Sequence, residues 1–470
     1  MVIYFQKTKM IKFLENKGIP GSFRDPSGFL FYRNGSIYRQ VNTVYKNNYD
    51  LLINSNLYKT LLDEKLLVSH EEIDTEGVEP DKAYKVLKVE SIPFISYPYE
   101  WCFSQLKDAA LTTLRIQKMA LNYGMSLKDA SVYNIQFRKC KPIFIDTLSF
   151  EKYNEGEPWV AYRQFCQHFL APLALMSYKD IRLNQLFRIF IDGVPLDLAS
   201  NLLPLRTYLK FSLLSHIHIH AKSQDYFADK AVKKNNRKMS RLSFLGLIDS
   251  LETIVNTMKW EAKGTEWSDY YQDTNYTSNG FGHKKEIVTK YLEKSKPNTV
   301  WDLGANVGIF SRIASDRGIQ TLSFDIDPAA VEKNYLRCAA QNEANILPLL
   351  SDLTNPSPSI GWGNEERMSL LERGPADTLF ALALIHHLVI SNNLPFNKIA
   401  KFLSNICKSL IIEFIPKNDS QVKRLLTNRE DIFPDYTCYA FEHAFKKYFK
   451  IRDSEKIKDS ERTLYLMEEI

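Results

Sequence analysis

The stretch "TVWDLGANVGIFSRIASDRGIQTLSFDIDP", from Thr299 to Pro328, decides the fold of the second half of the chain. It contains an apolar run, a turn with two glycines, a helical pattern and a second apolar run that ends in acids. Gly304 and Gly308 permit a tight turn because they have no Cβ to obstruct the backbone or a ligand lying on it. The following helix would present free N–H groups and its positive dipole end to that ligand. The pattern therefore predicts a strand–turn–helix–strand unit that binds a nucleotide-like molecule.

The charge of the turn indicates which kind of nucleotide-like molecule it holds. A dinucleotide-binding turn would read G-x-G-x-x-G, and a P-loop would end in Gly-Lys-Ser or Gly-Lys-Thr. Here an acid, Asp302, stands before the first glycine, and Asn306 lies between the two glycines. A carboxylate in that place would repel a pyrophosphate but suits a ligand with an ammonium or sulfonium group. Asp325 ends the second apolar run, where it is placed to accept hydrogen bonds from ribose hydroxyls.

These motifs resemble the cofactor loop of class I S-adenosylmethionine-dependent methyltransferases, from about residue 265 to the C-terminus. The resemblance implies an α/β fold with a doubly wound, Rossmann-like sheet of seven strands, the last one antiparallel. It also implies S-adenosylmethionine as the cofactor. The residues that would hold it are Asp302, Gly304, Ala305, Asn306 and Gly308 at the methionine part, Asp325 and Ile326 at the ribose, and Asp352 and Leu353 at the adenine. A structural turn without any cofactor is the alternative.

The segment "IHHL" at the end of the fourth apparent strand lies where this family has its substrate site. One imidazole of His386 or His387 would take a proton from a hydroxyl, since the pKa of histidine lies near neutral pH. Adjacent residues on a strand point to opposite sides, so at most one of the two is expected to be catalytic. The alternative is that the pair orients a loop or caps the next helix. Glu413, in the apolar run "LIIEFIP", is expected either to pair with a Lys or Arg or to face the substrate cleft.

An aromatic-rich segment, "TEWSDYYQDTNYTSNGFGHKKEIV", directly precedes this part of the chain. Aromatic faces attract cations, so Tyr270, Tyr271 and Tyr276 are candidates to stack on the adenine or the sulfonium. The alternative role for these tyrosines is to pack a lid onto the domain.

The front half contains "LKDASVYNIQFRKCKPIFIDTLSF", in which Asp129, Asn134 and Asp146 have the order found in kinases. A hairpin is predicted upstream around Asn34-Gly35, and a long helix follows it. Residues 20–220 therefore resemble a kinase-like domain. The resemblance implies that Asp129 orients a hydroxyl, while Asn134 and Asp146 bind magnesium against the phosphates of ATP.

This kinase-like pattern departs from the family in several places. There is no G-x-G-x-x-G loop and no V-A-I-K strand, and Lys128 precedes the first aspartate. Lys85 and Lys88 are candidates to contact the phosphates. Three interpretations stay open: a degenerate kinase-like fold, an active kinase, and a loop in which Asp129 only caps a turn.

Length and composition predict a two-part cytoplasmic protein. A chain of 470 residues is too long for one ordinary core. The predicted parts are an α+β kinase-like recruiting domain with a helical end (1–220), a helical and basic linker (221–262) and a methyltransferase domain (263–470). The six dispersed cysteines indicate reduced thiols, and no apolar run is long enough to span a bilayer. The net charge of +6 is modest, so the basic cluster "DKAVKKNNRKMSR" is expected to be a solvated linker rather than a nucleic-acid site.

The predicted activity is S-adenosylmethionine-dependent methyl transfer to an oxygen of a carbohydrate or another small-molecule acceptor. The whole chain is similar to bacterial nodulation-related methyltransferases. The combination of a kinase-like and a methyltransferase part also resembles enzymes that cap bacterial surface polysaccharides. An N-P-P-Y-like tetrapeptide, common in methyltransferases acting on amino groups, is absent, which favours oxygen or carbon acceptors. The alternatives are a phosphotransferase with a regulatory cofactor-binding domain, methylation of RNA or protein, and cofactor binding without catalysis.

Overall fold

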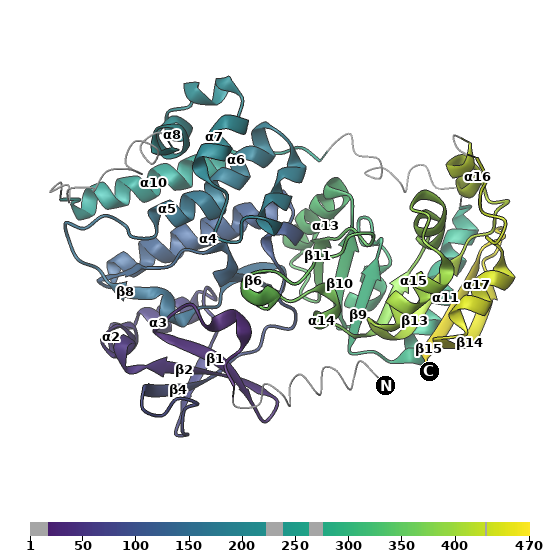
Figure 1. Cartoon of the computed structure of the whole chain (residues 1–470), viewed down its shortest axis with the longest axis horizontal. Helices are drawn as coiled ribbons and strands as arrows, with labels where there is room; N and C mark the ends of the chain where they lie inside the picture. The colour runs from purple at the N-terminus through teal and green to yellow at the C-terminus, as the bar shows by residue number, and fades with distance from the viewer. Residues whose placement is uncertain (1–16, 222–237, 263–275, 428–429) are drawn as a thin grey trace. The chain divides into compact units, whose positions relative to one another are not determined.

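The computed structural model describes residues 17–221, 238–262, 276–427 and 430–470 (Figure 1). Two compact units divide the chain. The C-terminal unit contains residues 262–359 and 368–470, and the N-terminal unit contains the described residues from 17 to 261 together with Ile360–Arg367. In the N-terminal unit, Glu366 accepts two hydrogen bonds from Arg24, at 2.9 and 2.7 Å.

A seven-stranded sheet with the order β11-β10-β9-β12-β13-β15-β14 forms the centre of the C-terminal unit. Neighbouring strands from β11 to β13 run parallel, whereas β15 is antiparallel to both β13 and β14. The predicted doubly wound sheet with an antiparallel last strand is therefore confirmed. The strands are β9 (Thr299–Leu303), β10 (Gln320–Asp325), β11 (Ile346–Leu350), β12 (Ala376–Ala381), β13 (Cys407–Phe414), β14 (Phe449–Lys456) and β15 (Thr463–Glu469).

Helices bury the central strands of this sheet, and parallel strands covered on both faces are apolar almost throughout. Val300 and Leu303 of β9 are fully buried, and Tyr291 from the helix before β9 packs into the same core as Val300. Asp327 caps the helix after β10 by accepting from the N–H of Ala329 at 2.8 Å. The α-helices are α11 (Ser278–Ser295), α12 (Ser311–Ser315), α13 (Pro328–Gln341), α14 (Leu370–Arg373), α15 (Phe396–Ser404), α16 (Ser420–Leu426) and α17 (Cys438–Phe445).

The N-terminal unit begins with a four-stranded antiparallel sheet of order β1-β2-β4-β3. Its strands are β1 (Gly28–Arg33), β2 (Ser36–Asn42), β3 (His70–Ile73) and β4 (Ala83–Val89). The turn between β1 and β2 has positive φ at both Asn34 (50°) and Gly35 (73°), as tight hairpins require. The predicted hairpin is confirmed. Two short ladders follow, β5 (Met125–Leu127) with β8 (Phe150–Lys152) and β6 (Ile135–Arg138) with β7 (Lys141–Phe144).

Helices make up the rest of the N-terminal unit, and the longest, α4 (Phe103–Asn122), packs along α10 (Arg241–Thr257) (Figure 1). Lys118 pairs with Asp249 at 2.7 Å, and Lys107 donates to the carbonyl of Asn256 at 2.8 Å. Of the helical and basic linker predicted over 221–262, residues 222–237 lie outside the described residues, and α10 is a helix that buries an apolar face in this unit. The other α-helices are α2 (Lys46–Asn54), α3 (Leu57–Asp63), α5 (Tyr162–Phe165), α6 (Ala171–Tyr178), α7 (Leu196–Leu202) and α8 (Phe211–Leu213).

Membrane-spanning helices do not occur in the part of the chain that the structure describes, since none of its helices combines the necessary length and apolar character.

Candidate functional site

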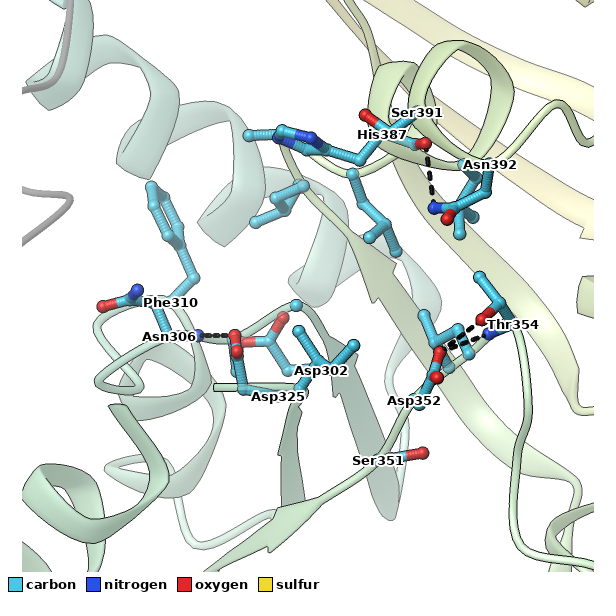
Figure 2. A pocket seen from close by; sticks show the side chains of 18 of the residues that line it. Asp302, Asn306, Phe310, Asp325, Ser351, Asp352, Thr354, His387, Ser391 and Asn392 are labelled. Atoms are coloured by element: carbon cyan, nitrogen blue, oxygen red, sulfur yellow. Dashed lines mark hydrogen bonds between the residues drawn. The ribbon is translucent and has the colours of Figure 1, made fainter. Parts of the chain in front are cut away.

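A cavity of about 310 Å³ lies in the C-terminal unit, with walls from the carboxyl ends of β9, β10, β11 and β12 (Figure 2). This edge of a doubly wound sheet is where such proteins bind ligands. The volume is at the lower end of the range for small-molecule sites. Most of the wall is apolar, with a few polar groups that converge from several strands.

The glycine turn after β9 forms one wall of the cavity. Gly304 and Asn306 have positive φ, at 75° and 51°, which folds the backbone tightly over the strand end. The N–H of Asn306 donates to Asp325 at 2.7 Å, so the turn is tied to the tip of β10. Gly308 also has positive φ, and a Cβ there would lie 2.6 Å from Nδ2 of Asn334. Gly308 is therefore required for packing, and it does not line the cavity although it was predicted as a cofactor residue.

Two buried carboxyl groups, Asp302 and Asp325, lie on neighbouring strands in the cavity wall (Figure 2). Asp302 accepts a hydrogen bond from the hydroxyl of Ser311 at 2.6 Å, and Asp325 accepts from the N–H of Asp327 at 2.8 Å. Burial raises the pKa of Asp302 to about 7 and that of Asp325 to about 6. A positively charged ligand would lower both values, because it stabilises the ionised carboxylates. The electrostatics of this end of the cavity therefore favour a cation.

The tip of β11 supplies a further acid. Asp352 accepts hydrogen bonds from the N–H and the hydroxyl of Thr354, at 2.8 and 2.7 Å. Leu353 follows it in the wall, and Ile326, which is 56% exposed, contributes apolar surface beside the tip of β10. The structure thus brings together, in one cavity wall, all the predicted cofactor residues except Gly308: Asp302, Gly304, Ala305, Asn306, Asp325, Ile326, Asp352 and Leu353.

Only one of the two candidate histidines lines the cavity. His387 is in the wall, whereas His386 is 1% exposed and lies behind it, with the two ring centroids 4.0 Å apart. Burial lowers the pKa of His387 to about 4, so its imidazole is neutral at neutral pH. In Figure 2 His387 lies across the cavity from Asp325, next to Ser391 and Asn392. The strand β12 ends at Ala381, and both histidines lie in the helical turn that follows it, so the predicted alternation along a strand does not apply to them.

A buried charge network closes the same side of the cavity. Glu413 is fully buried and accepts from Nζ of Lys284 at 2.6 Å, from the N–H of Ala383 at 2.8 Å and from the hydroxyl of Tyr276. Arg462 donates to the Tyr276 hydroxyl at 2.8 Å. Burial opposes ionisation of Glu413, but Lys284 and Arg462 outweigh it and hold its pKa below the usual value. Pairing of Glu413 was one of the two predicted outcomes, and it is the observed one.

The identity of these partners was not predicted. Lys284 lies in α11 and Arg462 in the turn before β15, and neither has a sequence feature that marks it as buried. The only available signal was the acid of Glu413 within an apolar strand, which requires a cation nearby. Tyr276 lines the cavity, but Tyr270 and Tyr271 lie outside the described residues.

The three kinase-like residues of the N-terminal unit also lie close together. Asp146 forms an ion pair with Arg39, and the N–H of Leu148 donates to it at 3.3 Å. Asn134 donates to the hydroxyl of Ser149 at 3.1 Å, and this hydroxyl in turn donates to Asp146. Burial opposes ionisation of Asp146, but Arg39 outweighs it and holds its pKa below the usual value.

The cation beside Asp146 is not one that the sequence singled out. Lys85 pairs with Glu72 at 2.7 Å on the exposed side of β4, while Arg39 projects from β2 toward Asp146. Asp129 accepts from the N–H of Ser131 at 2.9 Å. Within the described ranges, no group of three or more His, Cys, Asp or Glu side chains is arranged to hold a metal ion.

The strand order, the glycine turn and the acid-lined cavity define an α/β protein with a Rossmann-like sheet and a cavity at the carboxyl edge of that sheet. No family model matches the chain. Nodulation protein NoeA from Rhizobium meliloti (strain 1021) is 35% identical over 458 residues, which are 96% of each chain. The protein belongs to the family of NoeA, and the predicted similarity to nodulation-related proteins is confirmed.

Several solved structures are similar to part of the chain. Magnesium protoporphyrin IX methyltransferase (ChlM) from Synechocystis PCC 6803 with bound SAH matches 43% of this chain and 93% of its own, at 14% identity and a TM-score of 0.30. The N-methyltransferase NodS from Bradyrhizobium japonicum WM9 matches 41% of this chain and 97% of its own, at 9% identity and a TM-score of 0.30. WbdD matches 46% of each chain, at 14% identity and a TM-score of 0.30.

Proposed function

We propose that the protein transfers a methyl group from S-adenosylmethionine to a hydroxyl oxygen of a carbohydrate or another small molecule. The observation that carries this proposal is the pair of buried acids, Asp302 and Asp325, in a cavity at the carboxyl edge of the sheet. Both have raised pKa values because their ionised forms are poorly solvated in the cavity wall. A bound cation would stabilise those ionised forms and would be attracted to them in turn. The sulfonium and ammonium groups of S-adenosylmethionine supply that charge.

The cavity wall fits the parts of this cofactor. S-adenosylmethionine would supply the methyl group that is transferred. Asp302 and the turn at Gly304 would hold its methionine part, and Asp325 would accept hydrogen bonds from its ribose hydroxyls. Asp352 and the apolar surface of Ile326 would bind the adenine, the first as a hydrogen-bond acceptor and the second by packing.

The other side of the cavity supports an uncharged acceptor. His387 is neutral at neutral pH, because its pKa is lowered to about 4 and does not lie near neutral as predicted from the sequence. Its imidazole would therefore accept a proton from a hydroxyl only as a weak base. Lys284 is the single Lys or Arg among the described residues that line the cavity, and Glu413 compensates its charge. A phosphate or carboxylate acceptor would find no unpaired cation in this wall. A hydroxyl, as in a sugar, suits it better.

Calorimetric titration with S-adenosylmethionine tests the cofactor assignment. Asp325→Asn should weaken binding about tenfold to a hundredfold, the usual cost of losing a hydrogen bond to a charged group. Asp316→Ala is the matched control, because Asp316 is exposed in the same unit and should leave binding unchanged. If Asp325→Asn binds as tightly as the wild type, the ribose assignment is wrong.

For the N-terminal unit we propose a degenerate kinase-like domain that recruits the acceptor. The proximity of Asp129, Asn134 and Asp146 supports the kinase-like assignment. Magnesium does not fit the group as it stands, because Arg39, Ser149 and Leu148 already engage the Asp146 carboxylate. An active phosphotransferase would instead show magnesium-dependent ATP turnover that Asp146→Ala abolishes. An assay of ATP turnover with magnesium separates the two, and we expect no turnover.

A further inference from the structure

Three large apolar side chains project from one short segment of the N-terminal unit. Leu205, Leu209 and Phe211 are 84%, 88% and 80% exposed, and they lie within seven residues at η8 (Leu205–Leu209) and the start of α8. Among the other described residues, no stretch of seven contains three exposed large apolar side chains. Single exposed apolar residues are ordinary, but a cluster indicates a binding surface.

Buried contacts hold the segment 205–211 in place, so the exposure of its apolar side chains is not a sign of loose packing. Thr207 is buried, and its hydroxyl donates to the carbonyl of Pro204 at 2.7 Å and lies 3.0 Å from Nε2 of His218. The ring of Tyr208 stacks on His218 with a centroid distance of 3.7 Å. Because Thr207 and Tyr208 point inward, the apolar residues on either side of them are fixed pointing outward.

Positive charges alternate with these apolar side chains. Arg206 and Lys210 are both exposed, and Nζ of Lys210 lies 5.3 Å from the ring centroid of Tyr178. No Asp or Glu occurs between residues 198 and 221. An apolar groove on a partner protein could bind the apolar side chains, but it would not explain why all the charged residues between them are positive. An anionic lipid surface offers both an apolar interior and negative headgroups, and this combination is what such segments bind.

We propose that the segment Leu205–Phe211 docks the protein on the surface of a bilayer that contains anionic lipids. Leu205, Leu209 and Phe211 would enter the boundary between headgroups and acyl chains. Arg206 and Lys210 would lie against the lipid phosphates. This mode of binding requires no spanning helix, and it is independent of the proposed methyl transfer.

Flotation of the full chain with vesicles tests the proposal. The wild type should float with vesicles of phosphatidylcholine and phosphatidylglycerol and much less with phosphatidylcholine alone. The double variant Leu209→Ser/Phe211→Ser should partition at least about tenfold more weakly, because it loses two large apolar side chains. Arg206→Gln/Lys210→Gln should weaken binding about fivefold per lost charge at low salt. The control is Ile189→Ser, which removes a lone apolar side chain that is 74% exposed in the same unit.

Three results would overturn the proposal. The first is a wild type that stays unbound with both kinds of vesicle. The second is a Leu209→Ser/Phe211→Ser variant that floats like the wild type, which would assign lipid binding to the basic stretch 229–241 that this variant retains. The third is a concentration-dependent dimer in size-exclusion chromatography that this variant abolishes while vesicle binding persists, which would assign the segment to contact between copies. Unchanged thermal unfolding of the variant shows that it is folded, as expected for exposed positions.

Discussion

Replacing Lys284 with methionine should destabilise the C-terminal unit by about 3 to 5 kcal/mol, the usual cost of breaking a buried ion pair. Lys284 is 2% exposed and Glu413 fully buried, and the Nζ of the first lies 2.6 Å from a carboxylate oxygen of the second. Without Lys284, Arg462 is the one cation among the described residues that is paired with the two buried carboxylates of Glu413 and Asp419, which leaves one negative charge uncompensated. The uncompensated charge is the source of the cost.

The double variant Lys284→Met/Glu413→Gln should be less destabilised than the sum of its single variants. It removes one positive and one negative charge, and the remaining pair, Arg462 with Asp419 at 2.8 Å, is balanced. In the wild type the N–H of Ala383 donates a hydrogen bond to Glu413 at 2.8 Å. Glutamine keeps a side-chain oxygen that can accept this hydrogen bond. We expect a coupling energy of about 2 to 3 kcal/mol between the two sites, at the upper end of values for residues in contact.

Hydrogen exchange followed by mass spectrometry is the suitable assay, because a chain of two units need not unfold in one step. Peptides from β12 and β13 report on the C-terminal unit, and peptides from α4 report on the unit that should not change. Lys456→Met/Glu461→Gln is the matched control, since this pair is 2.8 Å apart but more than half exposed, at 57% and 62%. Each control change should cost below about 1 kcal/mol. If the Lys284 and Glu413 effects add within about 0.5 kcal/mol, the network is not coupled and the reasoning fails.

Four further predictions concern the cavity and the N-terminal unit. The pKa values of Asp302 and Asp325 are raised from 3.8 to about 7 and about 6, so the folded unit binds protons more tightly than the unfolded chain and should lose stability as the pH rises from about 4 to about 7. Affinity for S-adenosylmethionine should change in the opposite sense and rise as the pH passes about 6, which calorimetry across that range would measure. His387→Ala should lower the rate of methyl transfer by about a hundredfold or more while cofactor affinity stays within a few-fold, and parallel rate and binding assays would check this. Arg39→Ala should destabilise the N-terminal unit by about 3 kcal/mol or more, because it leaves the carboxylate of Asp146 without its cation, and hydrogen exchange in β2 would show it.

The cofactor side of the cavity could be predicted from sequence because its residues follow local rules. A glycine turn needs positive φ, and acids at the ends of parallel strands meet at one edge of the sheet. Asp302 and Asp325 are therefore visible as candidates in one strand–turn–helix–strand stretch. Gly308 obeys the same turn rule but serves packing against Asn334, a contact that depends on how α13 lies on the sheet. The turn pattern alone does not distinguish the two uses of glycine.

Residues set by tertiary contact could not be predicted in this way. Arg462 lies 178 positions beyond Lys284, and only the folded sheet brings both to Glu413. Arg39 reaches Asp146 from a different strand of the N-terminal unit, whereas the lysines chosen from sequence lie on β4. The helix α10 was assigned to a linker because a basic stretch precedes it, although its apolar face packs on α4.

A lysine in the wall of a cavity that we propose binds a cation requires an explanation, because like charges repel. Glu413 supplies it, since its carboxylate binds the Lys284 ammonium directly and compensates its charge. The ring centroids of Phe310 and Tyr276 lie 4.7 and 4.9 Å from the same ammonium, so the negative faces of these rings also stabilise its positive charge. Asp302 and Asp325 contribute negative charge to the same cavity wall. The buried network thus has two effects. It fixes the backbone at Ala383, close to His387, and it compensates the charge of Lys284, as the proposed binding of a positively charged cofactor requires.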